Sequence, residues 1–248
     1  MAIEIGDFIK YNFTGIVEST GDVYNTNVEE VAQEVGIFDD KTVYKPFLCI
    51  VGETQLFPEL AEEVIGSEVG DRLSVKVPSE HAFGPRDPKA VQLIHIKEFK
   101  NQGITPVAGM LVTVKGRQGR VLTVNGGRVK IDYNHELAGK DLICELEICE
   151  LIEDDDDKVK AIVEMNYSNQ SFDFDKTEVE WDGNVLNITL DPATKFDQDT
   201  CMNITIKKSQ MVNSIYGAFE NITEVNFIDS YKKPQDKSES EEEIESEE

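Results

Sequence analysis

Hydrophobic and polar residues alternate along much of the N-terminal part of the chain, and this period of two is typical of half-buried β-strands. The clearest examples are residues 8–17, 72–77 and 144–151. A short apolar run at residues 47–51 predicts a further strand, which a glycine ends. Turn-forming residues, such as those at 19–22, separate these segments. The pattern therefore predicts a domain built mainly of strands.

Two stretches with helical spacing interrupt the strands. Apolar residues recur on one face between residues 28 and 35, with Asn27 placed as the N-cap. After Pro58, residues 60–66 are typical of a single short helix that a glycine ends. We therefore expect few helices in this part of the chain, and short ones.

Between residues 84 and 131 the chain changes character. Strand-like segments follow one another at residues 91–96, 111–114, 120–124 and 128–132. Gly126-Gly127 predicts a hairpin turn between the last two. Closely spaced turns and short strands of this kind predict a small β-rich unit of its own, which we place at residues 85–130.

Five consecutive acidic residues, at positions 153–157, follow the strand-like segment that ends at residue 151. Because like charges repel one another within a regular element, the run predicts a domain boundary near residue 155. Beyond it, strand-like segments and a helix over roughly 194–219 predict a small α+β domain at residues 158–232. Residues 233–248 carry eight acidic residues and two lysines with almost nothing apolar, which predicts a disordered acidic tail.

The composition limits the functions that the chain can have. Forty per cent of its 248 residues are hydrophobic, enough for a core, so global disorder is excluded. Lys and Arg number 24 against 49 Asp and Glu, and the net charge of −25 disfavours binding to nucleic acid or to anionic membranes. We find no apolar run of transmembrane length, no signal-peptide pattern and no CxxC spacing among the four cysteines. These observations predict a cytoplasmic protein with free thiols.

Residues that carry covalent or metal chemistry are not grouped along the chain. The sequence has no phosphate-binding loop, no nucleophile elbow and no HExxH zinc motif. His81, His95 and His135 lie far apart, and the acidic runs lack the spacing of a calcium loop. The sequence thus predicts no cofactor and no metal.

Aromatic residues beside turns form an ordered series of short blocks. The blocks are Val23-Tyr24-Asn25-Thr26, Lys45-Pro46-Phe47, Leu56-Phe57-Pro58-Glu59-Leu60, Glu80-His81-Ala82-Phe83-Gly84 and Asn134-His135-Glu136-Leu137-Ala138-Gly139-Lys140-Asp141-Leu142. The series, within residues 3–152, resembles the FKBP-type peptidyl-prolyl cis-trans isomerases and most closely their SlyD-like branch. The last two blocks are the most specific, because in SlyD-like proteins they flank a β-rich domain inserted into the flap.

The resemblance implies a fold for the whole chain. It implies an α+β protein whose FKBP-type antiparallel half-barrel surrounds a short helix. This isomerase domain is discontinuous, comprising residues 1–84 and 131–152, with the inserted flap domain at 85–130. The α+β domain at residues 158–232 is similar to the extra segment of long archaeal members of the family.

The resemblance also implies where substrate binds. The catalytic pocket for the proline ring would be lined by Tyr11, Phe47, Leu60 and Phe83. The substrate peptide would further contact Tyr24, Asn25, Leu56, Phe57 and Leu137. Ordinary core packing is the alternative for these side chains, above all for Leu60, Leu137 and Tyr24. Three positions depart from the family pattern, since Asn25 replaces a usual aspartate and Cys144 replaces a common aromatic residue. The third is Leu60, which replaces a tryptophan often found at the pocket floor, as SlyD-like members also tolerate.

The inserted domain of SlyD-like proteins captures unfolded chains. Strict alternation would bury only part of the apolar set here, so Leu93, Ile94 and Phe99 are expected to form an apolar chaperone surface. A small self-contained β core with nothing exposed is the alternative.

Three functions follow as hypotheses. The first is a prolyl isomerase that assists folding, with unfolded or proline-containing polypeptides as partners and with client capture by the inserted domain. The second is a holdase chaperone or peptide-binding module with weak or no isomerase activity. The third stresses the C-terminal domain as a site of homodimerisation. None of the three involves nucleic acid or a membrane.

Overall fold

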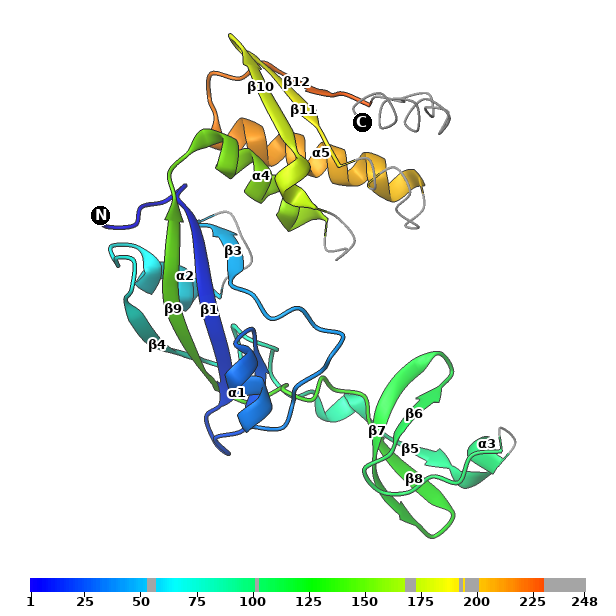
Figure 1. Ribbon diagram of the computed structural model, residues 1–248. Coiled ribbons are helices and arrows are strands. Elements are labelled where there is room, and N and C mark those ends of the chain that lie inside the picture. The colour runs from blue at the N-terminus through cyan, green and yellow to red at the C-terminus, as the bar shows by residue number, and fades with distance from the viewer. Residues whose placement is uncertain (53–56, 101–102, 168–172, 192–193, 195–200, 230–248) are drawn as a thin grey trace, which may run out of the picture. The chain divides into compact units, whose positions relative to one another are not determined.

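The structure is a computed structural model of the chain, and it describes all residues except 53–56, 101–102, 168–172, 192–193, 195–200 and 230–248 (Figure 1). The chain forms two compact units, Met1–Leu151 and Ile152–Glu248. Within the described residues, no helix combines the length and apolar character needed to cross a membrane.

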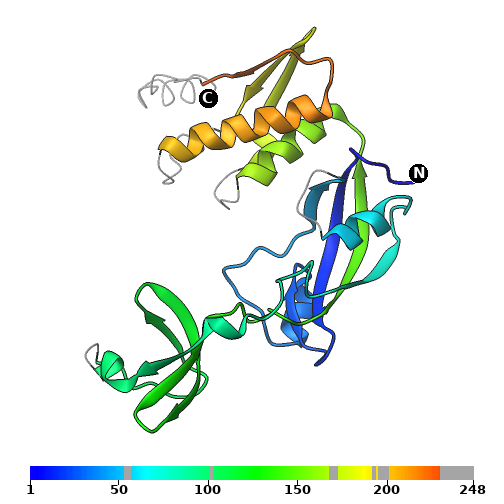
Figure 2. The same ribbon diagram turned by 180° about the vertical axis from the view of Figure 1, so that it is seen from behind.

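The first unit contains a five-stranded sheet to which both ends of the unit contribute. Its elements in chain order are β1 (Phe8–Val17), β2 (Val23–Thr26), α1 (Glu29–Glu34), β3 (Phe47–Ile50), α2 (Pro58–Val64), β4 (Arg72–Val77) and β9 (Leu142–Ile152). The strand order is β2-β1-β9-β4, with β3 also paired to β1. Because β4 and β9 pair antiparallel, the chain leaves the sheet after β4 and returns beside it, from Val77 to Leu142 (Figure 2).

One face of this sheet is apolar, because apolar residues occupy alternate positions of its strands and alternate residues of a strand point to the same face. The buried residues on it include Ile9 and Tyr11 of β1, Val75 and Val77 of β4, and Leu142, Cys144, Leu146 and Ile148 of β9. Helix α2 adds Leu60 and Val64, both fully buried in the same core. Since burying a large aliphatic side chain contributes roughly 1.5–3 kcal/mol, this face anchors the sheet and α2 together.

The insert folds as a second sheet with a separate core. Its elements are η1 (Pro88–Ala90), β5 (Val91–His95), α3 (Ile96–Lys100), β6 (Leu111–Val114), β7 (Arg117–Asn125) and β8 (Arg128–Asp132). The antiparallel order is β5-β8-β7-β6. The hairpin predicted at Gly126-Gly127 is confirmed, and both glycines have positive φ angles, of 55° and 74°, which glycine adopts without steric cost.

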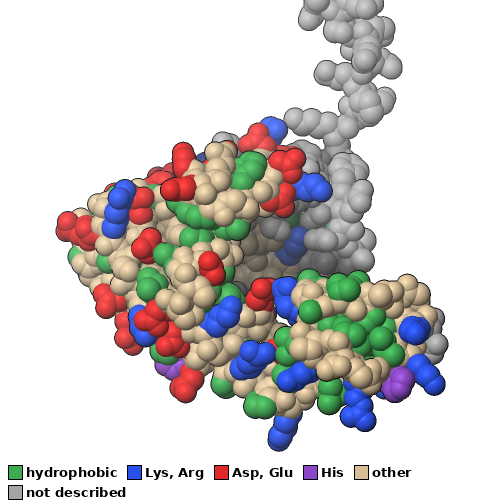
Figure 3. Space-filling view, turned by 90° about the horizontal axis from the view of Figure 1, so that it is seen from below, with side chains coloured by type: hydrophobic (Ala, Val, Ile, Leu, Met, Phe, Trp, Pro, Cys, Tyr) green, Lys and Arg blue, Asp and Glu red, His purple; other side chains and the backbone are tan. Residues whose placement is uncertain are grey.

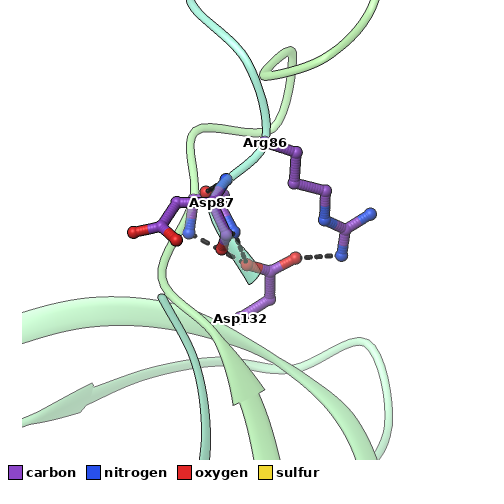
Figure 4. Close-up of polar contacts among 4 residues, drawn as sticks. Arg86, Asp87 and Asp132 are labelled. Carbon is purple, nitrogen blue, oxygen red and sulfur yellow. Dashed lines mark hydrogen bonds and ion pairs between the residues drawn. The ribbon is translucent and has the colours of Figure 1, made fainter. Parts of the chain in front are cut away.

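The two connections between the sheets are tied to each other (Figure 4). The side chain of Asn134 accepts a hydrogen bond from the Asp87 amide at 2.8 Å and donates one to the Asp87 carbonyl at 3.0 Å. The side chain of Asp132 accepts a hydrogen bond from the backbone amide of Asn134 at 3.0 Å and pairs with the guanidinium of Arg86. Each connection thus has polar groups of the other as partners, and this fixes where the insert begins and ends.

Phe99 corrects the expected chaperone surface. The strand pattern places it on the surface, but the chain turns into α3 at Ile96, and this turn carries Phe99 over the inner face of the sheet. The side chain is 1% exposed and lies in one core with Val129 and Ile131. Ile94 is half-buried against the same core, and Leu93 is 61% exposed. The prediction of exposure is therefore wrong for Phe99 and right for Leu93.

Asn27 is not the N-cap of the first helix. Helix α1 begins at Glu29 after Val28, which makes no side-chain cap. The buried Asn27 side chain instead accepts a hydrogen bond from the Phe13 amide at 2.7 Å and donates one to the Tyr11 carbonyl at 3.0 Å. These long-range bonds satisfy backbone groups of β1, and they outweigh the local preference for capping.

The second unit is a smaller α+β structure. Its elements are α4 (Asp155–Asn166), η2 (Phe174–Lys176), β10 (Glu178–Asp182), β11 (Val185–Thr189), α5 (Cys201–Ala218) and β12 (Glu224–Phe227). The sheet has the order β10-β11-β12, with β11 and β12 parallel. Helix α5 covers the later part of the helix predicted at 194–219, and residues 195–200 lie outside the described residues.

The acidic run at residues 153–157 is part of a helix, contrary to our prediction. Helix α4 begins at Asp155, and Asp154 is its N-cap, accepting hydrogen bonds from the amides of Asp156 and Asp157 at 3.0 and 3.1 Å. Carboxylates are stabilised in the first turn by the unpaired amides and the helix dipole, so the run starts the element instead of preventing it. The predicted tail at 233–248 lies outside the described residues.

Candidate active site

Tyr11 and Phe47 form the first part of an aromatic cluster on the apolar face of the larger sheet. The two residues are direct partners in the antiparallel pair β1–β3. Their ring centroids are 5.9 Å apart with planes at 70°, an edge-to-face contact. Tyr11 is buried, whereas Phe47 is 39% exposed and reaches solvent. The pair therefore joins the core to the surface.

Phe83 lies at the centre of a group of aromatic side chains. It follows β4 and meets Tyr24 edge to face at a centroid distance of 6.1 Å and Phe57 at 6.4 Å. The imidazole of His135 stacks on it, with centroids 4.3 Å apart and planes at 3°. The Phe83 ring thus brings together β2, the start of α2 and the segment before β9.

Tyr24 owes its position to a glycine on the neighbouring strand. A Cβ atom on Gly15 of β1 would lie 2.4–2.5 Å from three atoms of the Tyr24 ring, far inside van der Waals contact. The ring therefore lies directly over Gly15, where any other residue would displace it. The thiol of Cys144 on β9 lies close enough to the Tyr24 hydroxyl to affect its pKa. Cys144 is thus a polar neighbour of Tyr24 within the buried core.

The ionisable groups within this cluster are held in their neutral forms. Burial raises the pKa of Tyr11 and that of Tyr24, and nearby cysteine thiols raise both further. Burial also raises the pKa of Cys144 to about 11, although the neighbouring Tyr24 hydroxyl opposes this rise. At neutral pH the cluster therefore contains two phenols and a thiol without charge. A thiol in this state is a poor nucleophile.

A charged pair lies at the edge of the cluster. Glu59, in the first turn of α2, contacts Nδ1 of His81 through its Oε1 atom. The hydrogen bond from His81 lowers the pKa of Glu59, and the same bond raises the pKa of His81. The other carboxylate oxygen, Oε2, is buried and has no hydrogen-bond partner among the described residues.

Comparison with known proteins identifies the family of this chain. It is 38% identical over 140 residues to the short-type peptidyl-prolyl cis-trans isomerase of Methanocaldococcus jannaschii, covering 56% of this chain and 88% of that protein. This chain belongs to the FKBP-type peptidyl-prolyl cis-trans isomerases. The family model of that description matches residues 1–102, so the isomerase fold implied by the sequence motifs is confirmed.

Further matches concern the inserted and C-terminal parts of this FKBP-type isomerase and two more relatives. The models described as "FKBP26, IF domain" and "FKBP26_C-terminal" match residues 92–137 and 155–232. The FKBP-type 16 kDa isomerase of Escherichia coli is 27% identical over 111 residues, 43% of this chain and 74% of that protein. SlyD of Vibrio cholerae is 30% identical over 117 residues, 45% of this chain and 57% of that protein. The architecture is therefore an isomerase domain with an inserted and a C-terminal domain.

The structure places the predicted site residues in different ways. Phe83 contacts Tyr24 and Phe57, whereas Tyr11 and Phe47 form a separate edge-to-face pair. Tyr11 and the fully buried Leu60 lie in the core against which Phe83, Tyr24 and Phe57 pack. Leu137 is buried in the same core, and Asn25 is exposed on β2. Leu56 lies outside the described residues. The burial of Leu60 and Leu137 fits both a pocket floor and simple core packing, so their roles stay predictions.

Three contacts of the cluster were not foreseen from the sequence. The ring centroids of Phe13 and Phe47 are 6.4 Å apart. In addition, His135 stacks on Phe83, and Glu59 pairs with His81. The block that contains His81 and Phe83 was recognisable, but a sequence pattern does not show which side chains face each other. In the described part of the chain, no His, Cys, Asp and Glu side chains group so as to hold a metal ion.

The Glu59–His81 pair predicts a pH dependence of stability. The folded-state pKa of His81 is raised above its ordinary 6.5, so its contribution is complete below that pH and is lost as the pH rises through the folded value. The pKa of Glu59 is lowered from 4.5, so its contribution is present above that pH and is lost in acid. We therefore expect His81→Gln to lower the denaturation midpoint at about pH 5.5 and to change it little at about pH 9. An equal loss at both pH values in urea unfolding would show that the ion pair contributes nothing.

Proposed function

We propose that this isomerase catalyses rotation about Xaa–Pro bonds at the Phe83 cluster, without a covalent step, and receives its clients from the inserted domain. The observation that carries the proposal is the chemistry of the cluster. The Phe83 ring meets Tyr24 of β2 and Phe57 at the start of α2, and they pack on a core in which Tyr11 and Cys144, like Tyr24, stay neutral.

Such a surface suits this reaction because the reaction needs no acid, base or nucleophile. Rotation about the bond to proline crosses a barrier of about 18–20 kcal/mol, since it breaks amide resonance. The twisted amide has a less polar carbonyl than the planar ground state, so apolar surroundings disfavour the ground state more. Each tenfold acceleration requires about 1.4 kcal/mol of such a difference.

The proposed roles follow from position. Phe83, Phe57 and Tyr24 form walls around the proline ring, and Phe47 is the exposed aromatic at the opening. Tyr11 and Leu60 form the apolar floor, and Leu137 contributes from the segment before β9. Asn25, exposed on β2, would contact the substrate chain beside the proline. Leu56 lies outside the described residues, and its proposed contact with the substrate rests on the sequence motif alone.

The inserted domain would hold an unfolded client while its prolines sample the pocket. Leu93 offers the exposed apolar contact on β5, and Ile94 is partly accessible beside it. A client bound to the insert is tethered to the isomerase domain, so its local concentration at the pocket rises without new contacts there. Unfolded and proline-containing polypeptides are thus the proposed partners.

A holdase with little isomerase activity is the second candidate, and Cys144 in place of an aromatic residue favours it. The two are separated by refolding a protein whose slow phase is prolyl isomerisation, and by following light scattering of an aggregating protein without prolines. An isomerase accelerates the slow phase when present at far below the client concentration. A holdase leaves that phase unchanged and suppresses aggregation only at stoichiometric amounts.

We further propose that the C-terminal domain mediates homodimerisation. Its core contains Met211 and Ile215 of α5, whereas Ile206 and Tyr216 of the same helix are 50% and 41% exposed. We expect the full chain to be dimeric in multi-angle light scattering and a version ending at residue 151 to be monomeric. A monomeric full chain at micromolar concentration would exclude this role.

A further inference from the structure

The inserted domain has a charge opposite to that of the rest of the chain. Residues 85–130 contain nine Lys or Arg and two acidic residues, a net charge of +7, within a chain of net charge −25. All other residues together therefore carry −32. A segregation of this size creates a local field of attraction for anionic groups, although the average composition suggests only repulsion.

Part of this positive charge lies beside apolar side chains on one face of the insert sheet. Antiparallel partners share a face, and Leu93 of β5 is the partner of Lys130 on β8, as His95 is of Arg128. Leu93, Arg128 and Lys130 are exposed, whereas Ile94 and Val129, one residue along, lie in or against the core. This outer face, defined by Leu93, His95, Arg128 and Lys130, therefore combines apolar and cationic groups.

The cations of the outer face are available to a partner. Asp132, two residues after Lys130, is paired with Arg86, and Glu136 is paired with Arg120. No ion pair within the described residues involves Arg128 or Lys130. Figure 3 shows an apolar area with Lys and Arg at its margins on this part of the chain.

A hollow adjoins the outer face. It has a volume of about 430 Å³ and is lined by Arg86, Pro88, Val91, Leu122 and Lys130. Pro88, Val91 and Leu122 give it an apolar part, and its two cationic side chains come from the connection and from β8. An apolar side chain fits such a hollow, and an acidic neighbour in the same segment would meet Lys130.

We propose that the outer face of the insert selects extended polypeptide segments in which acidic residues accompany apolar ones. This rests on the proposed capture of clients and adds the chemistry that selects them. The charge of −32 elsewhere on the chain disfavours a long polyanion such as RNA, whereas a short acidic segment has its charges only where the insert is positive. On the outer face an apolar side chain, Leu93, lies beside a cationic one, Lys130. This mixture suits a polypeptide with apolar and acidic side chains better than the uniformly charged phosphate backbone of a nucleic acid.

The test uses fluorescent peptides without proline, so that the isomerase pocket plays no part. One peptide alternates Glu with Leu, and two others replace every Glu by Gln or by Lys. Fluorescence anisotropy with the full-length protein should give the order Glu over Gln over Lys. The affinity for the Glu peptide should fall as salt rises from about 50 to about 300 mM, because exposed charges are screened.

Charge reversal locates the site. Arg128→Glu with Lys130→Glu should weaken binding of the Glu peptide by about tenfold, as expected for two or more exposed ion pairs. Lys97→Glu with Lys100→Glu is the matched control, since these residues lie on α3, whose Phe99 covers the other face. It changes the net charge equally and should alter affinity by less than about threefold. Both variants should keep the far-ultraviolet circular dichroism and thermal midpoint of the wild type.

Several outcomes would overturn the proposal. Equal binding of the three peptides would show that the insert selects apolar character alone. Equal losses in the two double variants would show a dependence on net charge instead of a defined face. Tighter binding of an oligouridylate than of the Glu peptide, with the same dependence on Arg128 and Lys130, would identify a nucleic-acid surface. Because no peptide contains proline, none of these outcomes depends on whether the isomerase proposal is right.

Discussion

Phe83→Ala is expected to lower kcat/KM for a short Xaa-Pro peptide by about 10- to 100-fold, equal to about 1.4–2.7 kcal/mol of transition-state stabilisation. The ring contacts Tyr24, Phe57 and His135 at once, so its removal opens the cluster on three sides. Water then reaches the site and solvates the planar amide, which removes the advantage of the twisted form. A protease-free peptide assay measures the effect.

Phe38→Ala is the matched control for this substitution. Phe38 is also an aromatic residue of the isomerase domain, but it is 43% exposed and its ring stacks on Tyr44 at a centroid distance of 5.4 Å. We expect the kcat/KM of the Phe38→Ala variant to stay within about twofold of that of the wild type. If both variants lost activity equally, or if Phe83→Ala kept full activity while folded by circular dichroism, the reaction would not take place at the Phe83 cluster.

Replacing residues 87–129 by a short Gly-Ser loop is expected to separate catalysis from capture. The isomerase domain should stay closed, because β4 pairs with β9 from Val77 and Leu142 onward and the Gly139 amide donates to the Gly84 carbonyl at 2.8 Å. The activity on short peptides should therefore remain within about twofold. Catalysis of proline-limited refolding should fall by about 100-fold, because the tether that raises local client concentration is lost.

A proline-free unfolded protein serves as competitor in the same experiment. It should inhibit refolding catalysis by the full chain, leave the short-peptide activity of the full chain unchanged, and affect the deletion variant in neither assay. Undiminished refolding catalysis by the deletion variant would show that clients reach the pocket without the insert.

Local pattern and family motifs predicted most of the first unit. Alternation in 8–17 and 72–77 corresponds to β1 and β4, and the glycine pair corresponds to the β7–β8 hairpin. These elements are predictable because their residues satisfy local preference and burial together. The motif blocks likewise contained Tyr24 and Phe57, which contact Phe83. Blocks in the same order along the chain indicate the same fold, and the fold determines which blocks lie together.

The errors arose where a distant or opposing interaction decided the structure. Asn27 satisfies the Phe13 amide and the Tyr11 carbonyl of β1, which are distant in sequence, and Phe99 is carried inward by a helix of five residues that interrupts the strand period. The acidic run begins α4 because helix N-terminal amides offset the repulsion that the sequence suggests. The stacking of His135 on Phe83 depends on two segments separated by the whole insert.

The most direct test of the central claim is the rate of cis–trans exchange itself. Magnetisation-transfer NMR on an Xaa-Pro peptide, with the protein at about one hundredth of the peptide concentration, reports that rate without a coupled protease. The uncatalysed exchange takes on the order of 10–100 s at 25 °C. We expect the exchange rate to rise in proportion to protein concentration and the peptide's cis–trans equilibrium to stay unchanged. An exchange rate that does not rise even at equimolar protein would contradict catalysis at the Phe83 cluster.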